Sequence, residues 1–281
     1  MKIGYQGVEG AFSYIASNQI FPNEEYISFK TFFDVLNSIE KDKIDYGVLP
    51  IENSYAGRVA GMHNLFKDFC DKKLFITNEK MLKVEHFLCG VKGSKIENIT
   101  HIFSHEQALM QCQKNISKFL PTARSISKEN TAISAQFVAE NKNTSYASIC
   151  SKDACDKYGL QVLKENFQDS NDNYTLFIVL SKTQNKIPEN TKNVLTSMIF
   201  ELKNKAGALY HSLECFAKEN IDLVKIESYI PATSSSSAMF FITTRSNIED
   251  KNMIKAIKKL KEFTNNIYIF GSYFGDKKRF Y

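Results

Sequence analysis

Three polar side chains follow an apolar, strand-like segment near residue 50. The segment Val48–Ile51 leads directly into Glu52, Asn53 and Ser54. Open α/β sheets gather their ligand groups at the carboxyl ends of the strands. A carboxylate, an amide and a hydroxyl could orient a small polyoxygenated substrate, but none is a strong nucleophile without a neighbouring base. Asn53 and Ser54 could equally cap a following helix.

A glycine-rich segment lies between a predicted strand and a predicted helix at the start of the chain. It reads Gly4-Tyr5-Gln6-Gly7-Val8-Glu9-Gly10-Ala11-Phe12-Ser13. Free amides at the start of a helix can hold a carboxylate or a phosphate. The spacing of the glycines does not match the dinucleotide-binding or P-loop fingerprints. A plain turn, with Ser13 capping or packing, remains the alternative.

A third polar group lies where the strand-like Ile99–Phe103 runs into a helical pattern. Ser104 and Gln107 have the spacing of a capping box. Gln107 and Gln111 are four residues apart, so they share one face of the predicted helix. His105 could act as a general base, but a lone histidine beside a helix start is more often structural.

A fourth group, Asp169 to Phe177, precedes the last strand of the first 180 residues. Its Asx-rich part, Ser170–Asp172, is typical of a turn. Asn173 and Thr175 stand where the chain re-enters a strand, so their side chains could point into a cleft. Spacing alone leaves that open.

Metal and disulfide chemistry are not expected from the cysteines. The chain has six of them, without a C-x-x-C pair and without zinc-ligand spacing to histidine. They are Cys70, Cys89, Cys112, Cys150, Cys155 and Cys215. We therefore expect reduced thiols and no metal site.

Short apolar runs alternate with helical periods through the first 180 residues, which predicts β-α units around mostly parallel sheets. The predicted strands are Ile3–Tyr5, Tyr46–Ile51, Ile99–Phe103, Ser145–Ile149 and Thr175–Leu180. The predicted helices are Ala11–Phe21, Thr31–Glu40, Gln107–Phe119 and Ala132–Glu140. These elements would place the four polar groups at strand ends and helix starts.

A polar segment, Ser181–Asn193, contains Pro188 and lacks an apolar period, so we interpret it as a linker. The pattern after it predicts the order βαββαβ, a ferredoxin-like plan. The predicted elements are Val194–Leu202, Leu209–Glu219, Asp222–Ser228, Met239–Thr244, Asp250–Phe263 and Ile267–Ser272, with a serine-rich turn at Ser234–Ser237.

Length, composition and charge are typical of a soluble globular protein. The 281 residues suggest two or three compact units, with 43% hydrophobic and 24% charged residues. The formal charge is +5, but the lysines are scattered, so nucleic-acid binding is not expected. No apolar run approaches a membrane span, and no apolar signal segment follows Met1, so we expect a cytoplasmic protein without a membrane partner.

Taken in order, these groups resemble the prephenate dehydratase family over essentially the whole chain. The matching stretches are Gly7-x-x-Gly10-x-Phe12-Ser13, Pro50-Ile51-Glu52-Asn53-Ser54, Ser104-His105-x-Gln107 with Gln111-Cys112, Asn130-Thr131-Ala132, Asn173-x-Thr175-x-Phe177, Gly207-Ala208-Leu209 and Glu227-Ser228. Each motif is weak alone, whereas all of them in register are specific.

The resemblance implies an α/β protein with a two-lobed, periplasmic-binding-protein-like catalytic region and a ferredoxin-like βαββαβ ACT domain. The catalytic region would span residues 1–180, with lobes at 1–75 with 165–180 and at 76–164. Residues 181–193 would be the linker and 194–275 the ACT domain. A homodimer or homotetramer is also implied. Because no chorismate mutase segment is present in these residues, a monofunctional enzyme is expected.

The implied reaction is the decarboxylating dehydration of prephenate to phenylpyruvate, a step of phenylalanine biosynthesis that needs no cofactor. The family's essential threonine maps to Thr175. The other implied catalytic residues are Glu52, Asn53, Ser54, Ser104 and Gln111. The implied substrate-binding residues are Gly10, Ala11, Phe12, Ser13, Arg58, Asn130, Thr131, Asn173 and Phe177. Phenylalanine would act as an allosteric ligand at Gly207, Ala208, Leu209, Glu227 and Ser228.

The sequence departs from the family pattern at two places that matter for function. Leu176 replaces the arginine of the family's Thr-Arg-Phe. Either that arginine is structural, or Arg58 supplies the cation that the prephenate dianion needs. In the regulatory part, Tyr229 follows Glu227-Ser228 where the family has Arg-Pro, and Ala206 replaces a proline before Gly207.

Two other functions compete with prephenate dehydration. An arogenate dehydratase is one, because Tyr5-Gln6-Gly7-Val8 with Gly10-Ala11 also resembles the plant arogenate enzymes. A non-catalytic amino-acid sensor is the other, because two α/β lobes with a cleft resemble periplasmic-type binding folds and ACT domains are regulatory. Thr175, Ser104 and Gln111 favour catalysis, whereas Leu176 favours the sensor.

Overall fold

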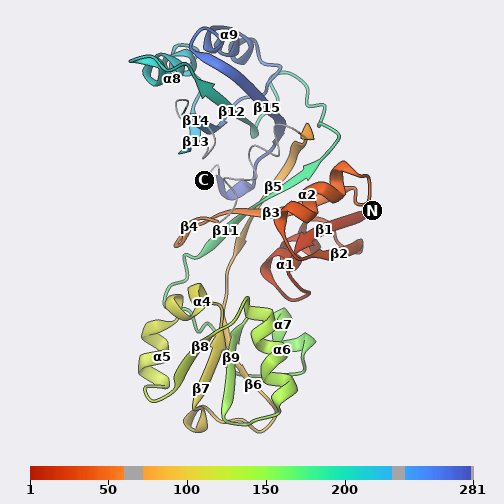
Figure 1. The fold of residues 1–281 in the computed structure, drawn as a ribbon, viewed down its shortest axis with the longest axis vertical. Helices are drawn as coiled ribbons and strands as arrows, with labels where there is room; N and C mark the ends of the chain where they lie inside the picture. Colours follow the sequence, from red (N-terminus) through yellow and green to blue (C-terminus); the bar gives the residue numbers. More distant parts are fainter. Residues whose placement is uncertain (60–71, 230–237, 280–281) are drawn as a thin grey trace. The chain divides into compact units, whose positions relative to one another are not determined.

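The computed structural model describes residues 1–59, 72–229 and 238–279 of an α/β chain with two sheets. The chain forms two compact units (Figure 1). Unit 1 comprises Met1–Val35, Val48–Val59 and Met81–Phe177. Unit 2 comprises Leu36–Gly47, Ala60–Lys80 and Ile178–Tyr281.

Unit 1 begins with a β-α-β segment made of β1 (Lys2–Gln6), α1 (Phe12–Ile20) and β2 (Glu25–Phe29). β1 and β2 pair in parallel, from Lys2 opposite Glu25 to Gln6 opposite Phe29. The chain continues through α2 (Phe32–Glu40), most of which belongs to unit 2. It then forms β3 (Tyr46–Asn53) and the short β4 (Gly57–Arg58), which pairs antiparallel with β3. With β11 (Tyr174–Ser181), the strands of this sheet follow the order β11-β3-β1-β2.

A second, five-stranded sheet with the order β10-β6-β9-β7-β8 forms the rest of unit 1. Its strands are β6 (Phe87–Gly90), β7 (His101–Ser104), β8 (Arg124–Ser127), β9 (Tyr146–Cys150) and β10 (Gln161–Lys164). β7 runs parallel to β8 and β9, whereas β6 is antiparallel to β9 and β10. Because β6 alone is reversed, the predicted parallel arrangement is confirmed for four of these strands.

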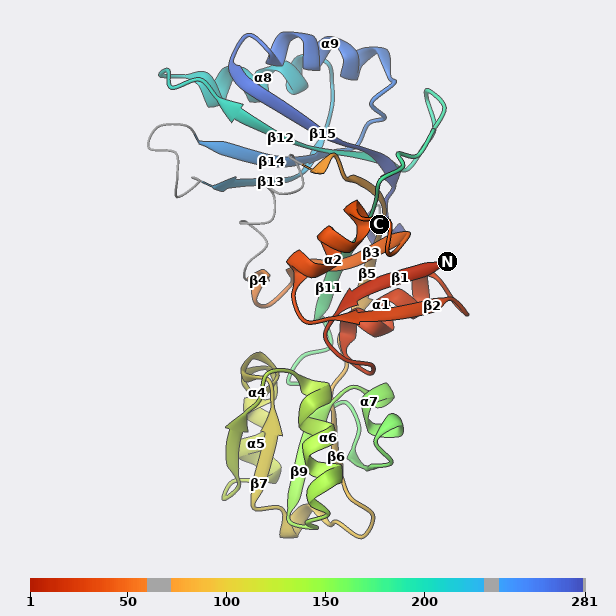
Figure 2. The ribbon, with the colours of Figure 1, turned by 45° about the vertical axis from the view of Figure 1, so that its right-hand side comes forward.

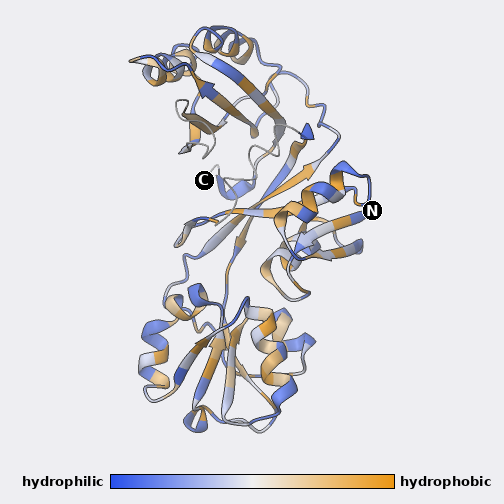
Figure 3. Ribbon diagram, viewed as in Figure 1, coloured by the Kyte–Doolittle hydropathy of each residue, from blue (hydrophilic) through white to orange (hydrophobic). Residues whose placement is uncertain are grey.

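Helices cover both faces of this sheet (Figure 1). They are α4 (Glu106–Gln111), α5 (Gln113–Phe119), α6 (Thr131–Asn141) and α7 (Lys152–Lys157), with a 3₁₀ turn at Ile96–Asn98. Alternate strand residues face opposite sides. Leu88, Ile102 and Ile149 therefore pack with α4 and α5, while Cys89, Phe103 and Cys150 pack with α6 and α7. Figure 3 shows apolar residues concentrated in these strands.

Unit 2 contains the expected βαββαβ order. Its elements are β12 (Val194–Leu202), α8 (Ala208–Lys218), β13 (Leu223–Tyr229), β14 (Met239–Thr244), α9 (Lys251–Leu260) and β15 (Thr264–Phe274), with a 3₁₀ turn at Lys277–Arg279. The strand order is β13-β14-β12-β15, antiparallel throughout, and Phe274 of β15 pairs with Asn78 of β5 (Phe75–Lys83). α8 and α9 cover one face (Figure 2) and enclose an apolar core with Phe200, Phe216 and Met253.

Most predicted elements form within a few residues of their predicted bounds, with one notable correction. The predicted helix Gln107–Phe119 is broken at Cys112 into α4 and α5. Residues 182–193 contain neither helix nor strand. The predicted serine-rich turn at Ser234–Ser237 lies outside the described residues.

Candidate active site

Asn53 ends β3 at a tight turn rather than at a helix start. Its Oδ1 accepts the backbone N–H groups of Tyr55 and Ala56, both at 3.0 Å. The chain then turns through Gly57, which has a positive φ of 70°, and returns as β4. The prediction that Asn53 and Ser54 cap a helix is therefore wrong. The two backbone bonds instead fix the orientation of the Asn53 amide.

The nitrogen of the Asn53 amide reaches the start of β11. Nδ2 lies 2.8 Å from Asn173 Oδ1 and 3.0 Å from Thr175 Oγ1. It also lies 3.2 Å from the backbone oxygen of Tyr174. Because Thr175 Oγ1 accepts this bond, its own proton remains available, and no acceptor for it lies within hydrogen-bond distance among the described residues.

Ser54 clamps the same two segments together. Its hydroxyl donates to the backbone oxygen of Asp172 and accepts from the backbone N–H of Tyr174, both at 3.0 Å. Its own backbone N–H donates to the backbone oxygen of Tyr174 at 2.9 Å. All of these bonds hold the backbone, so Ser54 positions β11 against the end of β3.

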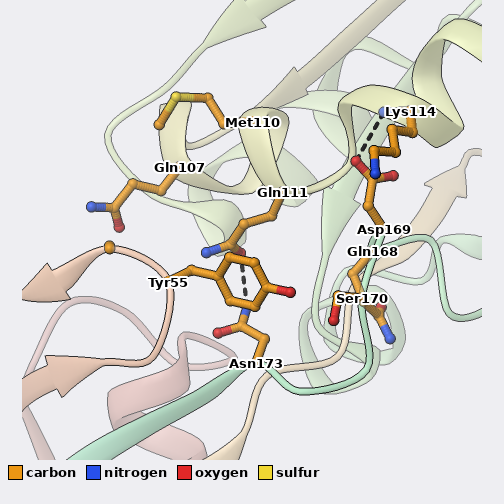
Figure 4. Close-up of a pocket in the computed structure, with 10 residues that line it drawn as sticks. Tyr55, Gln107, Met110, Gln111, Lys114, Gln168, Asp169, Ser170 and Asn173 are labelled. Carbon is orange, nitrogen blue, oxygen red and sulfur yellow. Dashed lines mark hydrogen bonds between the residues drawn. The ribbon is translucent and has the colours of Figure 1, made fainter.

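Asn173 carries the hydrogen-bonded chain on to Gln111 at the end of α4. Asn173 is almost fully buried, and its Nδ2 donates to Gln111 Oε1 at 2.9 Å. Figure 4 shows these two amides facing each other. Gln111 Oε1 also lies 3.0 Å from Nε2 of His86. Thr175, Asn53, Asn173, Gln111 and His86 thus form one chain, which we call the amide chain.

His86, which the sequence reasoning missed, closes the amide chain from the segment between β5 and β6. Only 2% of its surface is exposed, and its Nδ1 has no hydrogen-bond partner among the described residues. Burial lowers the pKa of His86 to about 4, and the bond to Gln111 offsets only part of that effect. The imidazole is therefore neutral at pH 7.

A cavity of about 320 Å³ opens beside the amide chain (Figure 4). That size suits a small-molecule ligand. Its wall is formed by Tyr55, Ala56, Gln107, Met110, Gln111, Lys114, Gln168, Asp169, Ser170 and Asn173. Gln107 and Gln111 share one helix face, as predicted. Thr175 is not part of the wall but is joined to it through Asn53 and Asn173.

The break between α4 and α5 is stabilised by Asp169. Its carboxylate accepts the backbone N–H groups of Lys114 and Asn115, both at 2.9 Å, so it caps α5 from a distant segment. Its own N–H donates to the backbone oxygen of Gln111 at 2.8 Å. Cys112, at the break, is fully buried, and burial raises the pKa of its thiol. A protonated, buried thiol is not a nucleophile.

Ser104 and His105 have roles that differ from the prediction. His105, not Ser104, is the N-cap of α4, because its Nδ1 accepts the N–H of Gln107 at 3.3 Å. The predicted Ser104–Gln107 capping box is therefore wrong. Ser104 is fully buried at the end of β7, and its hydroxyl donates to the backbone oxygen of Ile149. The structure does not bring Ser104 into the amide chain.

The glycine-rich segment packs against α7 and His86. Gly10 has a φ of 88°, and a Cβ there would lie 2.9 Å from Cα of Ala154, so only glycine fits. Ala11 precedes α1 without a side-chain cap, and Ser13 is buried inside the helix. Phe12 contacts the His86 ring edge-on, with ring centroids 5.6 Å apart. Phe12 is the residue of this segment that reaches the amide chain.

The remaining predicted site residues are four that were predicted to bind substrate and Glu52, which was predicted to be catalytic. Asn130 caps α6, its Oδ1 accepting the N–H of Ile133 at 2.8 Å, and Thr131 is buried in the first turn. Glu52 pairs across the β3-β4 hairpin with Arg58, whose side chain is exposed. Phe177 is fully buried in β11.

Leu176 lies on the face of β11 opposite Thr175, because successive strand residues alternate. Its side chain is buried, with 6% of its surface exposed. An arginine at this position would therefore point away from the Thr175 hydroxyl. Of the two explanations for the missing arginine, the geometry favours a structural role in relatives.

The predicted allosteric residues lie in unit 2. Gly207 has a positive φ of 79° and begins α8, followed by buried Ala208 and partly buried Leu209. Glu227 and Ser228 lie in β13, where Glu227 pairs with Lys225 at 2.7 Å. Ile230 and Pro231, part of the altered motif, lie outside the described residues.

Among the residues that the structure describes, no group of three or more His, Cys, Asp or Glu side chains is arranged to hold a metal ion. The same residues include no helix long and apolar enough to cross a membrane.

The model of the prephenate dehydratase family matches residues 3–185. The chain belongs to the prephenate dehydratase family. Two curated relatives are each 33% identical to this chain and cover 97% of it. One is the bifunctional chorismate mutase/prephenate dehydratase of Aquifex aeolicus (strain VF5), matched over 275 residues and 73% of its own length. The other is arogenate dehydratase/prephenate dehydratase 1 of Arabidopsis thaliana, matched over 287 residues and 72% of its length.

Solved structures also resemble this member of the prephenate dehydratase family. The prephenate dehydratase of Arthrobacter aurescens, in complex with L-Phe, is 24% identical, with a TM-score of 0.89 over 99% of this chain and 91% of that one. GqqA, described as a novel type of quorum quenching acylase, is 28% identical, with a TM-score of 0.91 over 99% and 100% of the two chains. The fold is thus shared by proteins with different described activities.

Sequence reasoning missed several residues that the structure brings to the site. Besides His86, these are Tyr55, Met110, Lys114 and Gln168. Lys114 follows Gln111 by three residues, so helical spacing could have suggested it. His86 follows β5 in an unremarkable segment, and only the fold brings it to Gln111.

Proposed function

We propose that the protein is a prephenate dehydratase, which converts prephenate into phenylpyruvate, carbon dioxide and water. The observation that carries this proposal is the amide chain, which joins Thr175 to the wall of a ligand-sized cavity. Family membership supports the same reaction. The experiment is turnover of prephenate by the purified protein, with formation of phenylpyruvate expected and its absence contradicting the proposal.

The reaction needs orientation of the substrate and help for a departing oxygen. The bond from the ring carbon to its carboxylate breaks, and its electron pair moves into the ring. The bond from the opposite carbon to the hydroxyl then breaks, and the ring becomes aromatic. A hydrogen bond from Thr175 stabilises the departing oxygen, which gains a proton and leaves as water. Asn53 supports this role because it occupies the lone pair of Thr175 rather than its proton.

The cavity offers partners for the two carboxylates of prephenate. Lys114 supplies an ammonium group, and Gln107 and Gln111 supply amide N–H groups. Hydrogen bonds from charged donors to carboxylates are the strong ones. Lys114 therefore takes the place in substrate binding that the sequence had offered to Arg58. Carbon dioxide loss is helped where the cavity wall excludes water from the ring carboxylate.

Arogenate is the second candidate substrate, because one curated relative carries both names. Arogenate has an ammonium group where prephenate has a keto oxygen, so it calls for a carboxylate partner. The carboxylate in the cavity wall belongs to Asp169, and its two oxygens already accept backbone N–H groups. That engagement favours prephenate. Side-by-side turnover should give the higher kcat/KM with prephenate, and the reverse order would assign arogenate.

Unit 2 contains the residues for which we infer a regulatory role. Its βαββαβ order supports an ACT domain at residues 194–275. We infer that a linker at 181–193 precedes it and that residues 1–180 form the catalytic region. One lobe of that region would comprise 1–75 and 165–180, and the other 76–164. Gly207-Ala208-Leu209 and Glu227-Ser228 support phenylalanine as the allosteric ligand. Equilibrium dialysis with labelled phenylalanine tests this role, and no binding at millimolar ligand would remove it.

We also infer a homodimer or homotetramer in the cytoplasm, on the family resemblance. Light scattering coupled to size-exclusion chromatography measures the mass directly. A particle of about 32 kDa, the mass of one chain, would contradict the oligomer.

A further inference from the structure

We propose that His86 is a positioning residue, protonated on Nε2, that holds the Gln111 amide with its nitrogen toward the substrate cavity. This inference rests on the proposed function, because the cavity is taken as the substrate site. His86 touches no cavity surface itself and acts through Gln111.

The backbone fixes the direction of every hydrogen bond in the amide chain. Asn53 Oδ1 accepts two backbone N–H groups, which can only donate, so Asn53 Nδ2 must be the donor to Asn173 Oδ1. Asn173 Nδ2 is then the donor to Gln111 Oε1. Since Gln111 Oε1 can only accept, the proton between it and His86 must sit on Nε2.

The surroundings of His86 hold the ring in that state. The backbone N–H of His86 donates to Gln168 Oε1 at 2.8 Å, and the backbone oxygen of His86 accepts the backbone N–H of Phe167 at 2.7 Å. The ring packs edge-on against Phe12. Nδ1 has no hydrogen-bond partner among the described residues. Backbone tethers and ring packing therefore leave Nε2 facing Gln111.

The consequence appears at the cavity wall. With Oε1 of Gln111 occupied by two donors, its Nε2 has no partner among the described residues and faces the cavity (Figure 4). An N–H donor suits a carboxylate, whereas a flipped amide would present an oxygen and repel it. Without the His86 donor, only Asn173 would oppose that flip.

Two variants of His86 separate positioning from simple packing. His86→Gln keeps an N–H donor near the Nε2 position, whereas His86→Phe keeps a ring and removes the donor. We expect His86→Phe to lower kcat/KM about tenfold, the loss of one buried hydrogen bond, and His86→Gln to recover most of it. His101→Phe, a half-buried histidine of β7 outside the amide chain, is the matched control and should leave kcat/KM unchanged.

The pH profile separates positioning from proton transfer. If His86 only positions Gln111, the His86→Phe variant should have a lower plateau of kcat/KM than wild type. Its pH profile should keep the acid limb. Loss of an ionisation from the profile would overturn the proposal, as would equal activity of folded His86→Phe and wild type.

A spectroscopic measurement on the wild type keeps the test independent of turnover. Two-bond proton–nitrogen correlation spectra of the ¹⁵N-histidine-labelled wild type, with His86 assigned through the Gln variant, report which ring nitrogen carries the proton. We expect a neutral ring protonated on Nε2 at pH 7. A proton on Nδ1 would overturn the proposal. If wild type shows this tautomer but no turnover of prephenate, the proposed function fails while the geometry of His86 stands.

Discussion

The side-chain nitrogen of Asn53 lies 3.0 Å from the hydroxyl oxygen of Thr175, although the two residues are 122 positions apart in the sequence. Because the other end of the Asn53 amide is held by two backbone N–H groups, this nitrogen can only donate. Thr175 is thereby left with a free proton at the end of the amide chain. The predictions below follow from that arrangement and its surroundings.

Removing the Thr175 hydroxyl should slow the reaction more than it weakens binding. Thr175→Val keeps the shape of the side chain, and we expect kcat to fall by roughly 10²–10³-fold, the usual loss for one positioned donor to a developing oxyanion. Thr175→Ser retains the donor and should retain most of kcat. Steady-state kinetics with prephenate measure both, with melting temperature as the folding control. A Val variant with near-full turnover would exclude Thr175 as the donor.

Neutralising Lys114 should affect KM. Lys114→Met removes the ammonium group from the cavity wall, and we expect KM for prephenate to rise about tenfold, since charged hydrogen bonds contribute more than neutral ones. Lys118→Met is the matched control, because Lys118 lies on α5 outside the cavity wall and rests over the Phe119 ring. Equal KM values for the two variants would argue against a substrate contact at Lys114.

Restoring the family arginine at Leu176 should destabilise the protein without improving binding. Leu176→Arg places a guanidinium at a buried site on the strand face opposite Thr175, and an unpaired buried charge costs several kcal/mol. Urea unfolding should show the loss, and KM for prephenate should not decrease. A lower KM with intact stability would mean that the arginine reaches the substrate.

Protonation of His86 should contribute to acid unfolding. Its pKa is about 4 in the folded protein, against 6.5 for an unperturbed side chain. Between these values the unfolded chain binds the proton more readily, so acidification favours unfolding. The stability that the neutral His86 side chain contributes is fully present above pH 6.5 and is lost as the pH falls through 4. Relative to His86→Gln, wild type should therefore lose about 3 kcal/mol of its free energy of unfolding between pH 7 and pH 4. A difference independent of pH would contradict the lowered pKa.

The buried carboxylate of Glu79 should depend on Arg279 within unit 2. Arg279 Nε lies 3.1 Å from Glu79 Oε1, and the Glu79 side chain is fully buried. Burial raises the pKa of Glu79, although Arg279 counteracts the effect. Arg279→Met leaves the carboxylate without its cation and should lower the free energy of unfolding by about 3–5 kcal/mol. Adding Glu79→Gln should restore part of the loss. If the double variant is no more stable than the single one, the pair is not coupled.

Local sequence patterns predicted the helices and strands well, because these elements depend on short-range periodicity. The strand Val194–Leu202 forms with its predicted bounds, and the ferredoxin-like order follows from alternating periods. The break at Cys112 was not predictable from the periodicity, because the cap for α5 comes from Asp169, more than fifty residues further along the chain. The parallel arrangement does not extend to β6, which is antiparallel to β9 and β10, or to β4, which is antiparallel to β3.

The site was predictable only where its residues cluster in the sequence. Asn53, Gln111, Asn173 and Thr175 each stand at an element boundary, and the resemblance named all four. His86 was missed because its role depends on a contact with Gln111, 25 residues further along the chain, whereas Lys114 was missed although it follows Gln111 by only three residues. Ser104 illustrates the reverse error, since its position at a strand end suggested a functional side chain, whereas its hydroxyl binds the backbone of Ile149.

Turnover of prephenate by the purified protein tests the central claim most directly. Phenylpyruvate and carbon dioxide should form in equal amounts without added metal or cofactor, and Thr175→Val, assayed alongside, should be slower by roughly 10²–10³-fold. Wild-type protein that is folded but forms no phenylpyruvate above the uncatalysed rate would contradict the proposed function.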